Sequence, residues 1–184
     1  MKMQEHIIYG GAASTVVGCF WGPWNALVFW LASVLIDFDH YLDHVYRTGG
    51  GDWKVSSIFK MDAYCRRKLE SGQMQQQALC LSLFHTVEVF AAVYAAAKYY
   101  EQSFFMFVFF GMVFHLFLDL LAMAQYNAVF VRALSLAEYM IRRALMKRRG
   151  INPDLFYREA FHALGIPTRV REAGRAKSTT PTSE

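Results

Sequence analysis

Histidine and carboxylate side chains recur at regular spacing in parts of this sequence that otherwise hold almost no charge. The set comprises His6, Asp37, Asp39, His40, His44, His85, Glu88, His115 and Asp119. Within each apolar segment several of them are three, four or seven residues apart, as in His85 and Glu88 or His115 and Asp119, and residues at those spacings share one face of a helix. Several helices that each contribute such a pair can hold a metal ion in the centre of a bundle.

The residue types favour a divalent metal ion. Imidazole nitrogen and carboxylate oxygen suit Zn²⁺ best, with Mn²⁺ or Fe²⁺ as alternatives. The three cysteines are odd in number and widely spaced, which excludes a disulfide framework and a thiolate zinc site. We expect one or two ions, because the donors outnumber the ligands of one tetrahedral ion. The expected ligands are His6, Asp37, Asp39, His40, His85, His115 and Asp119.

Two further residues are candidates for proton transfer beside the ion, namely Glu88 and His44. Each candidate also has a purely structural interpretation. A single histidine in an apolar helix more often packs than binds metal, an Asp-x-Asp at a helix end is often a cap, and Glu88 can pair with a buried basic residue. His162 lies in the C-terminal region, away from the other candidates in the sequence, and we interpret it as an ordinary side chain.

The elements that carry these residues are long apolar stretches. Ile7 to Ile36 contains no charged residue, and Asp119 is the only one between Glu101 and Arg132. Crossing the apolar core of a bilayer takes about 20 helical residues. The expected spans are about His6–Phe20, Trp24–His40, Ala78–Ala97 and Ser103–Ala124. The first two form a hairpin at Gly22-Pro23, a turn and helix-breaking pair, although a single kinked span is an alternative.

Basic residues set the expected orientation. Residues 41–77 and the chain after Ala124 are rich in lysine and arginine, whereas the connections Phe20–Trp24 and Lys98–Gln102 are not. Because basic connections stay on the cytoplasmic side, both termini are expected in the cytoplasm of a protein of the cell inner membrane. In that orientation every candidate ligand lies in the same half of the membrane. Ionisable groups at that depth are costly and are usually functional.

The expected fold class is therefore all-α, a polytopic membrane helix bundle of about four transmembrane helices with amphipathic cytoplasmic helices at its C-terminal end. Residues 1–125 form the membrane domain with the metal site, and 41–77 are its basic cytoplasmic connection. Residues 126–169 form amphipathic helices, about Arg132–Arg149 and Pro153–Leu164, with Asn152 as an N-cap. Residues 170–184 are expected to be disordered.

The same residues resemble a known family, the predicted membrane-bound metal-dependent hydrolases of bacteria and archaea. The resemblance rests on His6, Asp37-Phe38-Asp39-His40, His85 and His115-Leu116-Phe117-Leu118-Asp119, and it covers about residues 1–125. Two positions depart from the family pattern, Ile36 in place of a proline and His85-Thr86 in place of a His-Ser pair. The resemblance implies a short membrane protein with a metal site.

The function expected from these features is hydrolysis of an ester or phosphoester, with membrane lipid as the partner. The basic flanks of the membrane domain are suited to anionic lipid headgroups, and no nucleic acid is expected as a partner. An alternative is a metal-binding membrane protein without catalysis, either a transporter or a scaffold. A soluble helical bundle with a large apolar core is a third possibility.

Overall fold

The structure is a computed structural model that describes residues 3–73, 78–100 and 102–169. The described chain is mostly helical, which confirms the all-α fold class. Its helices are α1 (Met3–Trp21), α2 (Pro23–Leu35), α3 (Phe38–Arg47), α4 (Val55–Glu70), α5 (Val87–Tyr100), α6 (Ser103–Ala124), α7 (Leu136–Arg148) and α8 (Pro153–Ala163). The predicted disordered tail, residues 170–184, lies outside the described residues.

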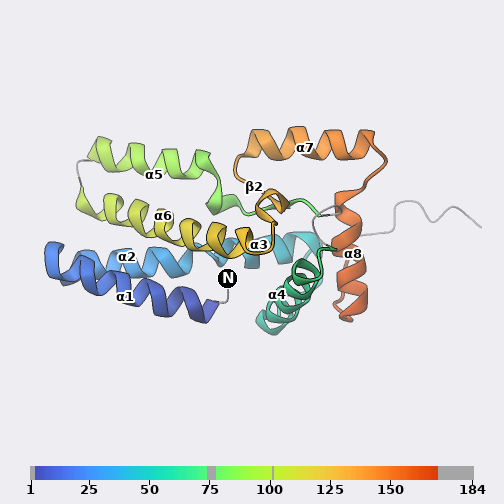
Figure 1. Cartoon of the computed structure of the whole chain (residues 1–184), viewed down its shortest axis with the longest axis horizontal. Helices are drawn as coiled ribbons and strands as arrows, with labels where there is room; N and C mark the ends of the chain where they lie inside the picture. Colours follow the sequence, from blue (N-terminus) through green and yellow to red (C-terminus); the bar gives the residue numbers. More distant parts are fainter. Residues whose placement is uncertain (1–2, 74–77, 101, 170–184) are drawn as a thin grey trace, which may run out of the picture.

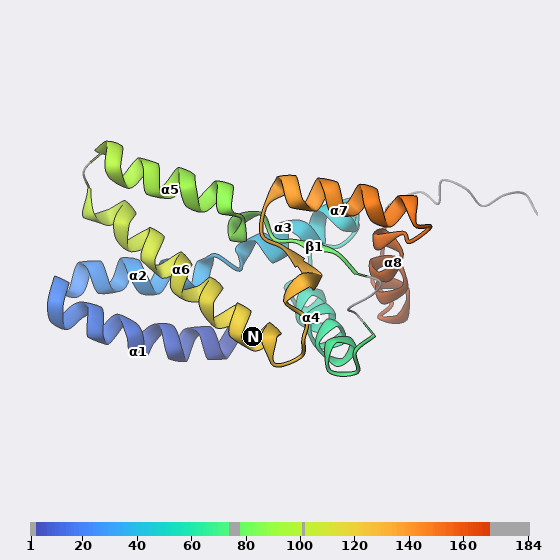
Figure 2. The same cartoon turned by 45° about the horizontal axis from the view of Figure 1, so that its top comes forward.

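Two antiparallel helix hairpins form one end of the molecule (Figure 1). The α1–α2 hairpin and the α5–α6 hairpin turn at the same end, and α6 crosses between α5 and α2 (Figure 2). The predicted break at Gly22-Pro23 is confirmed, because Gly22 has φ +87° and Pro23 is the first residue of α2. Glycine adopts that left-handed backbone without steric cost, and proline at the first helical position gives up no hydrogen bond.

Close helix contacts in this bundle depend on small residues. A Cβ at Gly111 of α6 would lie 2.4 Å from the Phe29 carbonyl oxygen and 3.1 Å from the Ser33 nitrogen, both in α2. At Gly10 of α1 it would lie 2.6 Å from the Ser33 hydroxyl. The absence of side chains at Gly10 and Gly111 therefore lets α1 and α6 approach α2 at the level of Ser33.

The expected helices differ from the observed ones at two places. The predicted helix Trp24–His40 ends at Leu35, and α3 begins three residues later. The predicted span Ala78–Ala97 is helical only from Val87, since Cys80–Leu81 forms strand β1 and Leu83–His85 a short 3₁₀ turn, η1. Strand β1 pairs in parallel with β2 (Arg132–Ala133), and this distant pairing replaces the first turns of the expected helix.

Four full-length spans are therefore not observed. Among the described helices only α6 is long and apolar enough to cross a membrane by itself. At 1.5 Å per residue, the 13 residues of α2 and the 14 of α5 extend roughly 20 Å each. That is less than the bilayer core of about 30 Å.

The opposite end of the molecule is a helical cap made of α3, α4, α7 and α8 with its own apolar core (Figure 1). Phe156, Ala160 and Phe161 of α8 pack there against Met61 of α4. The predicted N-cap is confirmed, because the Asn152 side chain accepts a hydrogen bond from the Asp154 N–H. The expected amphipathic helix from Arg132 begins only at Leu136, after a Ser135 cap.

Candidate metal centre

Four of the predicted ligands meet where the bundle joins the cap. One ligand atom from each of Asp37, His85, His115 and Asp119 lies within 4.8 Å of all the others. The His115 Nε2 atom is 3.2 Å from Asp37 Oδ1 and 3.6 Å from Asp119 Oδ2. The His85 Nε2 atom is 3.7 Å and 3.9 Å from the same two oxygens. Residues far apart in sequence thus converge from the α2–α3 turn, η1 and α6.

The two histidines present bare nitrogens to this space. The Nδ1 atom of His115 is 2.7 Å from the Ser33 carbonyl oxygen, and Nδ1 of His85 is 3.1 Å from a carboxylate oxygen of Asp39. Both partners are acceptors, so in the neutral imidazoles Nδ1 carries the proton and Nε2 carries a lone pair. Both Nε2 atoms are buried and have no hydrogen-bond partner among the described residues. A metal ion could satisfy two such lone pairs at once.

Two predicted ligands instead hold the other ligands in position. Asp39 accepts hydrogen bonds from the Phe84 N–H and from His85, so it orients that imidazole. The His6 Nε2 atom is 3.1 Å from Asp119 Oδ1, and its ring stacks on His115 at 3.8 Å between centroids. Such outer partners fix the orientation of metal ligands in proteins. Neither Asp39 nor His6 belongs to the four converging residues.

His40 is the exposed member of the group. Its Nε2 atom is 3.3 Å from Asp37 Oδ1, and its side chain is 40% exposed, whereas His85 and His115 are fully buried. His40 therefore lies at the opening of the site, where a side chain can contact both solvent and the ligand Asp37.

Arg132 was not among the predicted site residues. Its Nη1 atom donates to Asp119 Oδ2 at 2.7 Å, and its side chain is largely buried. The pairing of β1 with β2 and a hydrogen bond from the Val87 N–H to the Leu134 carbonyl bring it there. The sequence pattern placed Arg132 in an amphipathic surface helix. The only sequence signal for another role is the position of Arg132 soon after the predicted span that contains Asp119.

The charges of the site favour a divalent cation. Asp37, Asp39 and Asp119 bring three negative charges, and Arg132 brings one positive charge. With neutral histidines the group carries two net negative charges in a buried place, which is costly without compensation. An ion of charge +2 balances them, so residue types, geometry and charge all fit a metal.

The two predicted proton-transfer residues lie elsewhere. Glu88 accepts hydrogen bonds from the Ser135 hydroxyl and the Leu136 N–H, so it ties α5 to the start of α7. His44 is buried against Phe161, with Nε2 3.2 Å from Asp52 Oδ2. Because His85 lies in η1 and not in α5, it does not share a helix face with Glu88 as the spacing suggested.

Asp52 and His44 form a structural pair beneath α4. Burial alone raises the pKa of the Asp52 carboxyl group, but hydrogen bonds from the Ser57 hydroxyl, the Lys54 N–H and His44 outweigh it, so the pKa is lowered. The Thr48 hydroxyl also accepts the Asp52 N–H. These contacts join α3 to the first turn of α4.

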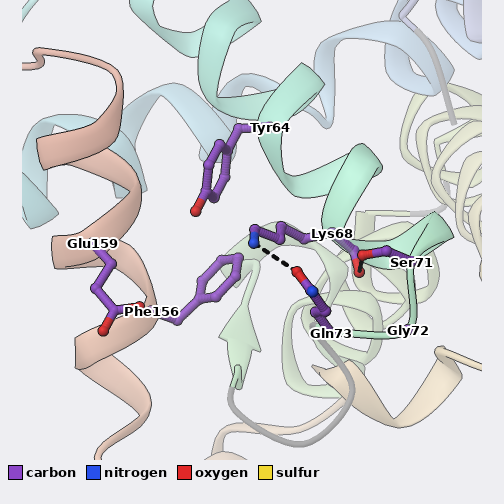
Figure 3. A pocket seen from close by; sticks show the side chains of 7 residues that line it. All are labelled: Tyr64, Lys68, Ser71, Gly72, Gln73, Phe156 and Glu159. Atoms are coloured by element: carbon purple, nitrogen blue, oxygen red, sulfur yellow. Dashed lines mark hydrogen bonds between the residues drawn. The ribbon is translucent and has the colours of Figure 1, made fainter.

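The cap contains a hollow that is separate from the metal centre and is lined by none of the metal-site residues (Figure 3). It has a volume of about 380 Å³ and lies between α4 and α8. The Lys68 ammonium inside it is already hydrogen-bonded to Gln73 and lies over the Tyr64 ring. The arrangement there offers no donor set comparable to the metal centre.

Comparison of the chain with protein-family models, curated proteins and solved structures finds no match.

Proposed function

We propose that this protein is a membrane-embedded metal-dependent hydrolase that cleaves a phosphoester of a lipid. The observation that carries the proposal is the pair of buried, unpartnered Nε2 atoms of His85 and His115, which face the oxygens of Asp37 and Asp119. Two nitrogens and two carboxylate oxygens form a donor set typical of Zn²⁺, with Mn²⁺ or Fe²⁺ as alternatives. A bound ion supplies a Lewis acid and a water of lowered pKa.

Four converging ligands match one ion, so we propose a single metal and not two. His6 and Asp39 then serve as positioning residues for Asp119 and His85. The family resemblance agrees with this proposal over residues 1–125, but it does not include Arg132.

Arg132 supports a phosphoester over a carboxylic ester as the substrate. A guanidinium group presents several donors in one plane and binds two phosphate oxygens together. Arg132 touches Asp119, so a phosphoryl group at the ion lies within reach of the same side chain. His40, at the exposed edge, is suited to donate a proton to the leaving oxygen, the role first expected of Glu88 or His44.

We further propose that the bundle of α1, α2, α5 and α6 lies in the membrane, with the cap in the cytoplasm. Large apolar side chains are exposed along its outer faces, among them Ile8, Phe110 and Phe117. Aromatic residues are exposed at the hairpin ends, as interfacial Trp and Tyr often are; these are Trp21, Trp24, Tyr99 and Tyr100. Of the described helices, only α6 is both long and apolar enough for a full span, so the shorter helices α2 and α5 must be completed by the cap or by a locally thinner bilayer.

The depth of the site agrees with this placement. His6 is 15 residues from the end of α1 at Trp21, and His115 is 12 residues from the start of α6 at Ser103. At 1.5 Å per residue, these positions are roughly 18–22 Å from the hairpin ends. In an apolar core of about 30 Å, the site then lies in the cytoplasmic half, roughly 8–12 Å from the cytoplasmic boundary, where a lipid headgroup can reach it. A transport site needs access from both sides, so this one-sided position favours hydrolysis over metal transport.

The test uses the full chain purified in detergent. We expect about one equivalent of zinc by elemental analysis and release of phosphate or headgroup from at least one anionic phospholipid. Arg132→Gln should retain the metal and lower kcat/KM for the phospholipid by roughly 100-fold, the size of effect that follows loss of one preorganised charge-stabilising donor.

The matched control is Arg66→Gln, because Arg66 pairs with Asp62 on the exposed side of α4, away from the site. Its metal content and its activity should equal those of the unchanged protein. Purified protein that binds no divalent metal would refute the proposal. Hydrolysis that is equally fast in the Arg132→Gln protein would refute the phosphate-binding role.

A further inference from the structure

We propose that a groove between α2 and α5 holds an acyl chain of the lipid substrate and leads that lipid to the metal centre. This inference rests on the proposed function, because it concerns the substrate of the same site. It adds a binding site for the apolar part of that substrate.

The groove is a hollow of about 220 Å³ whose lining side chains are all apolar. They include Leu35, Ile36, Phe84, Val89, Val93 and Met112. Both α2 and α5 pack on α6, which forms the floor, while α5 stands apart from α2 on the other side of α6 (Figure 2). We infer that this hollow opens toward the lipid of the proposed membrane.

One end of the groove lies beside the metal centre, as the positions of three lining residues in the chain indicate. Ile36 directly precedes the ligand Asp37, and Phe84 directly precedes the ligand His85. Met112 lies about one helical turn before His115 in α6. Three lining residues are thus close neighbours in the chain of three proposed ligands, so the apolar groove lies beside the polar site.

The apolar lining and the small volume of the groove limit which molecules can bind in it. A polar group inside the groove would lose its hydrogen bonds to water and find no partner, which costs free energy. Pockets for whole small molecules usually measure about 300–1,000 Å³, so 220 Å³ holds only part of a single hydrocarbon chain. At the site end, Arg132 is suited to an anionic group. One apolar chain attached to a phosphate matches both ends.

A photo-crosslinking experiment tests the groove without requiring hydrolysis. The probe is phosphatidic acid with a diazirine in one 16-carbon acyl chain, added to the full-length zinc-loaded protein in detergent. Mass spectrometry should find crosslinks concentrated at the lining residues of the groove, at least fivefold above those on the outer face of α6 near Phe117. A large excess of unlabelled long-chain phosphatidic acid should suppress them.

The variant Val93→Trp fills the groove, and Val113→Trp is its control, since Val113 is exposed on α6 and does not line the groove. We expect Val93→Trp to lower crosslinking in the groove at least tenfold with unchanged zinc content, and Val113→Trp to leave it unchanged. Retained zinc shows that the site still folds. If Val93→Trp loses zinc, the milder Val93→Phe takes its place with the same expected loss of crosslinking.

Two results separate this inference from the proposed function. Crosslinks spread evenly over the exposed apolar faces, and unaffected by Val93→Trp, would overturn the acyl-chain groove even if phospholipid is hydrolysed. Crosslinks confined to the groove in a protein that hydrolyses no lipid would support the groove and refute the hydrolase.

Discussion

At the scale of single residues, the structure separates the four converging side chains from the residues that hold them. Asp37 and Asp39 are two positions apart and carry the same group, yet Asp37 faces both bare histidine nitrogens while Asp39 contacts the Nδ1 side of His85. The sequence pattern selected both as ligands. It had no means to separate them, because that difference depends on which oxygen meets which side of an imidazole after the chain has folded.

This difference predicts unequal effects of two similar substitutions. The Asp39 carboxylate orients the His85 imidazole and makes its Nε2 atom a stronger electron-pair donor to a metal ion. Asp39→Asn removes this negative charge, so zinc affinity should fall by about 10–100-fold. Asp37→Asn removes a ligand and should lower the affinity further. The measurement is competition with a chelator of known affinity.

Asp62→Asn is the control for both, since Asp62 pairs with Arg66 on the exposed face of α4. Equal affinities for Asp39→Asn and Asp62→Asn would show that the contact between Asp39 and His85 does not affect metal binding.

At the scale of helices, the approach of α6 to α2 positions His115. Because Gly111 lets α6 lie close to the α2 backbone, the His115 Nδ1 atom comes within hydrogen-bonding distance of the Ser33 carbonyl oxygen. The nearly charge-free stretch between Glu101 and Arg132 predicted α6 well, since its expected and observed bounds are the same, Ser103–Ala124. It did not predict which face approaches α2, because the close contact depends on a missing side chain and not on hydrophobicity.

The variant Gly111→Val should therefore both destabilise the bundle and weaken metal binding. Its Cβ would meet the α2 backbone, and overpacking of this kind costs about 1–3 kcal/mol. The measurements are the unfolding midpoint in detergent and zinc affinity.

Gly18→Ala is the comparison, because a Cβ at Gly18 meets only Ala26 at 3.4 Å, an ordinary contact. It should be neutral or stabilise the protein by up to about 1 kcal/mol, since alanine favours a helix more than glycine does. If Gly111→Val is as stable as Gly18→Ala, the proposed close approach is wrong.

The contact between α3 and α4 predicts a dependence of stability on pH. The folded state lowers the pKa of Asp52, so this group stabilises the protein above the pKa of an unfolded aspartate, about 4. That stabilisation is lost as the pH falls from about 4 through the lower folded pKa. Asp52→Asn should lower stability at neutral pH and flatten the change in unfolding midpoint below pH 5.

Asp62→Asn again serves as the comparison, because Asp62 lies in an exposed pair. It should retain the acid dependence of the unchanged protein. An Asp52→Asn protein with the same acid dependence as the unchanged one would assign the effect to other carboxyl groups.

At the scale of the whole molecule, the exposed apolar bundle and the polar cap predict an asymmetric placement in the membrane. The protein should remain in membranes washed with alkaline carbonate, whereas a soluble bundle would be extracted. Cys19 is exposed, so the labelling variants also carry Cys19→Ser. In that protein, Gln102→Cys should react with a membrane-impermeant maleimide in intact cells. Arg148→Cys should react only after permeabilisation.

The remaining cysteines interfere little with this measurement. Burial, together with the neighbouring Cys80, raises the pKa of the Cys65 thiol, and maleimides react with the thiolate. Labelling of Arg148→Cys in intact cells would reverse the proposed orientation. Protection of both positions in intact cells would indicate that the α5–α6 hairpin does not cross the membrane.

The sequence by itself determined the helical class, the break at Gly22-Pro23, the N-cap at Asn152 and a set of seven candidate ligands that contains the four converging residues, Asp37, His85, His115 and Asp119. These features depend on local propensity or on ionisable groups in apolar segments, and both can be recognised along the chain. The tertiary structure alone decided that Arg132 joins the site, that Asp39 and His6 position other residues, and that Glu88 and His44 belong to other contacts. Each of these outcomes depends on pairing between distant segments, such as β1 with β2, whose partners no local pattern specifies.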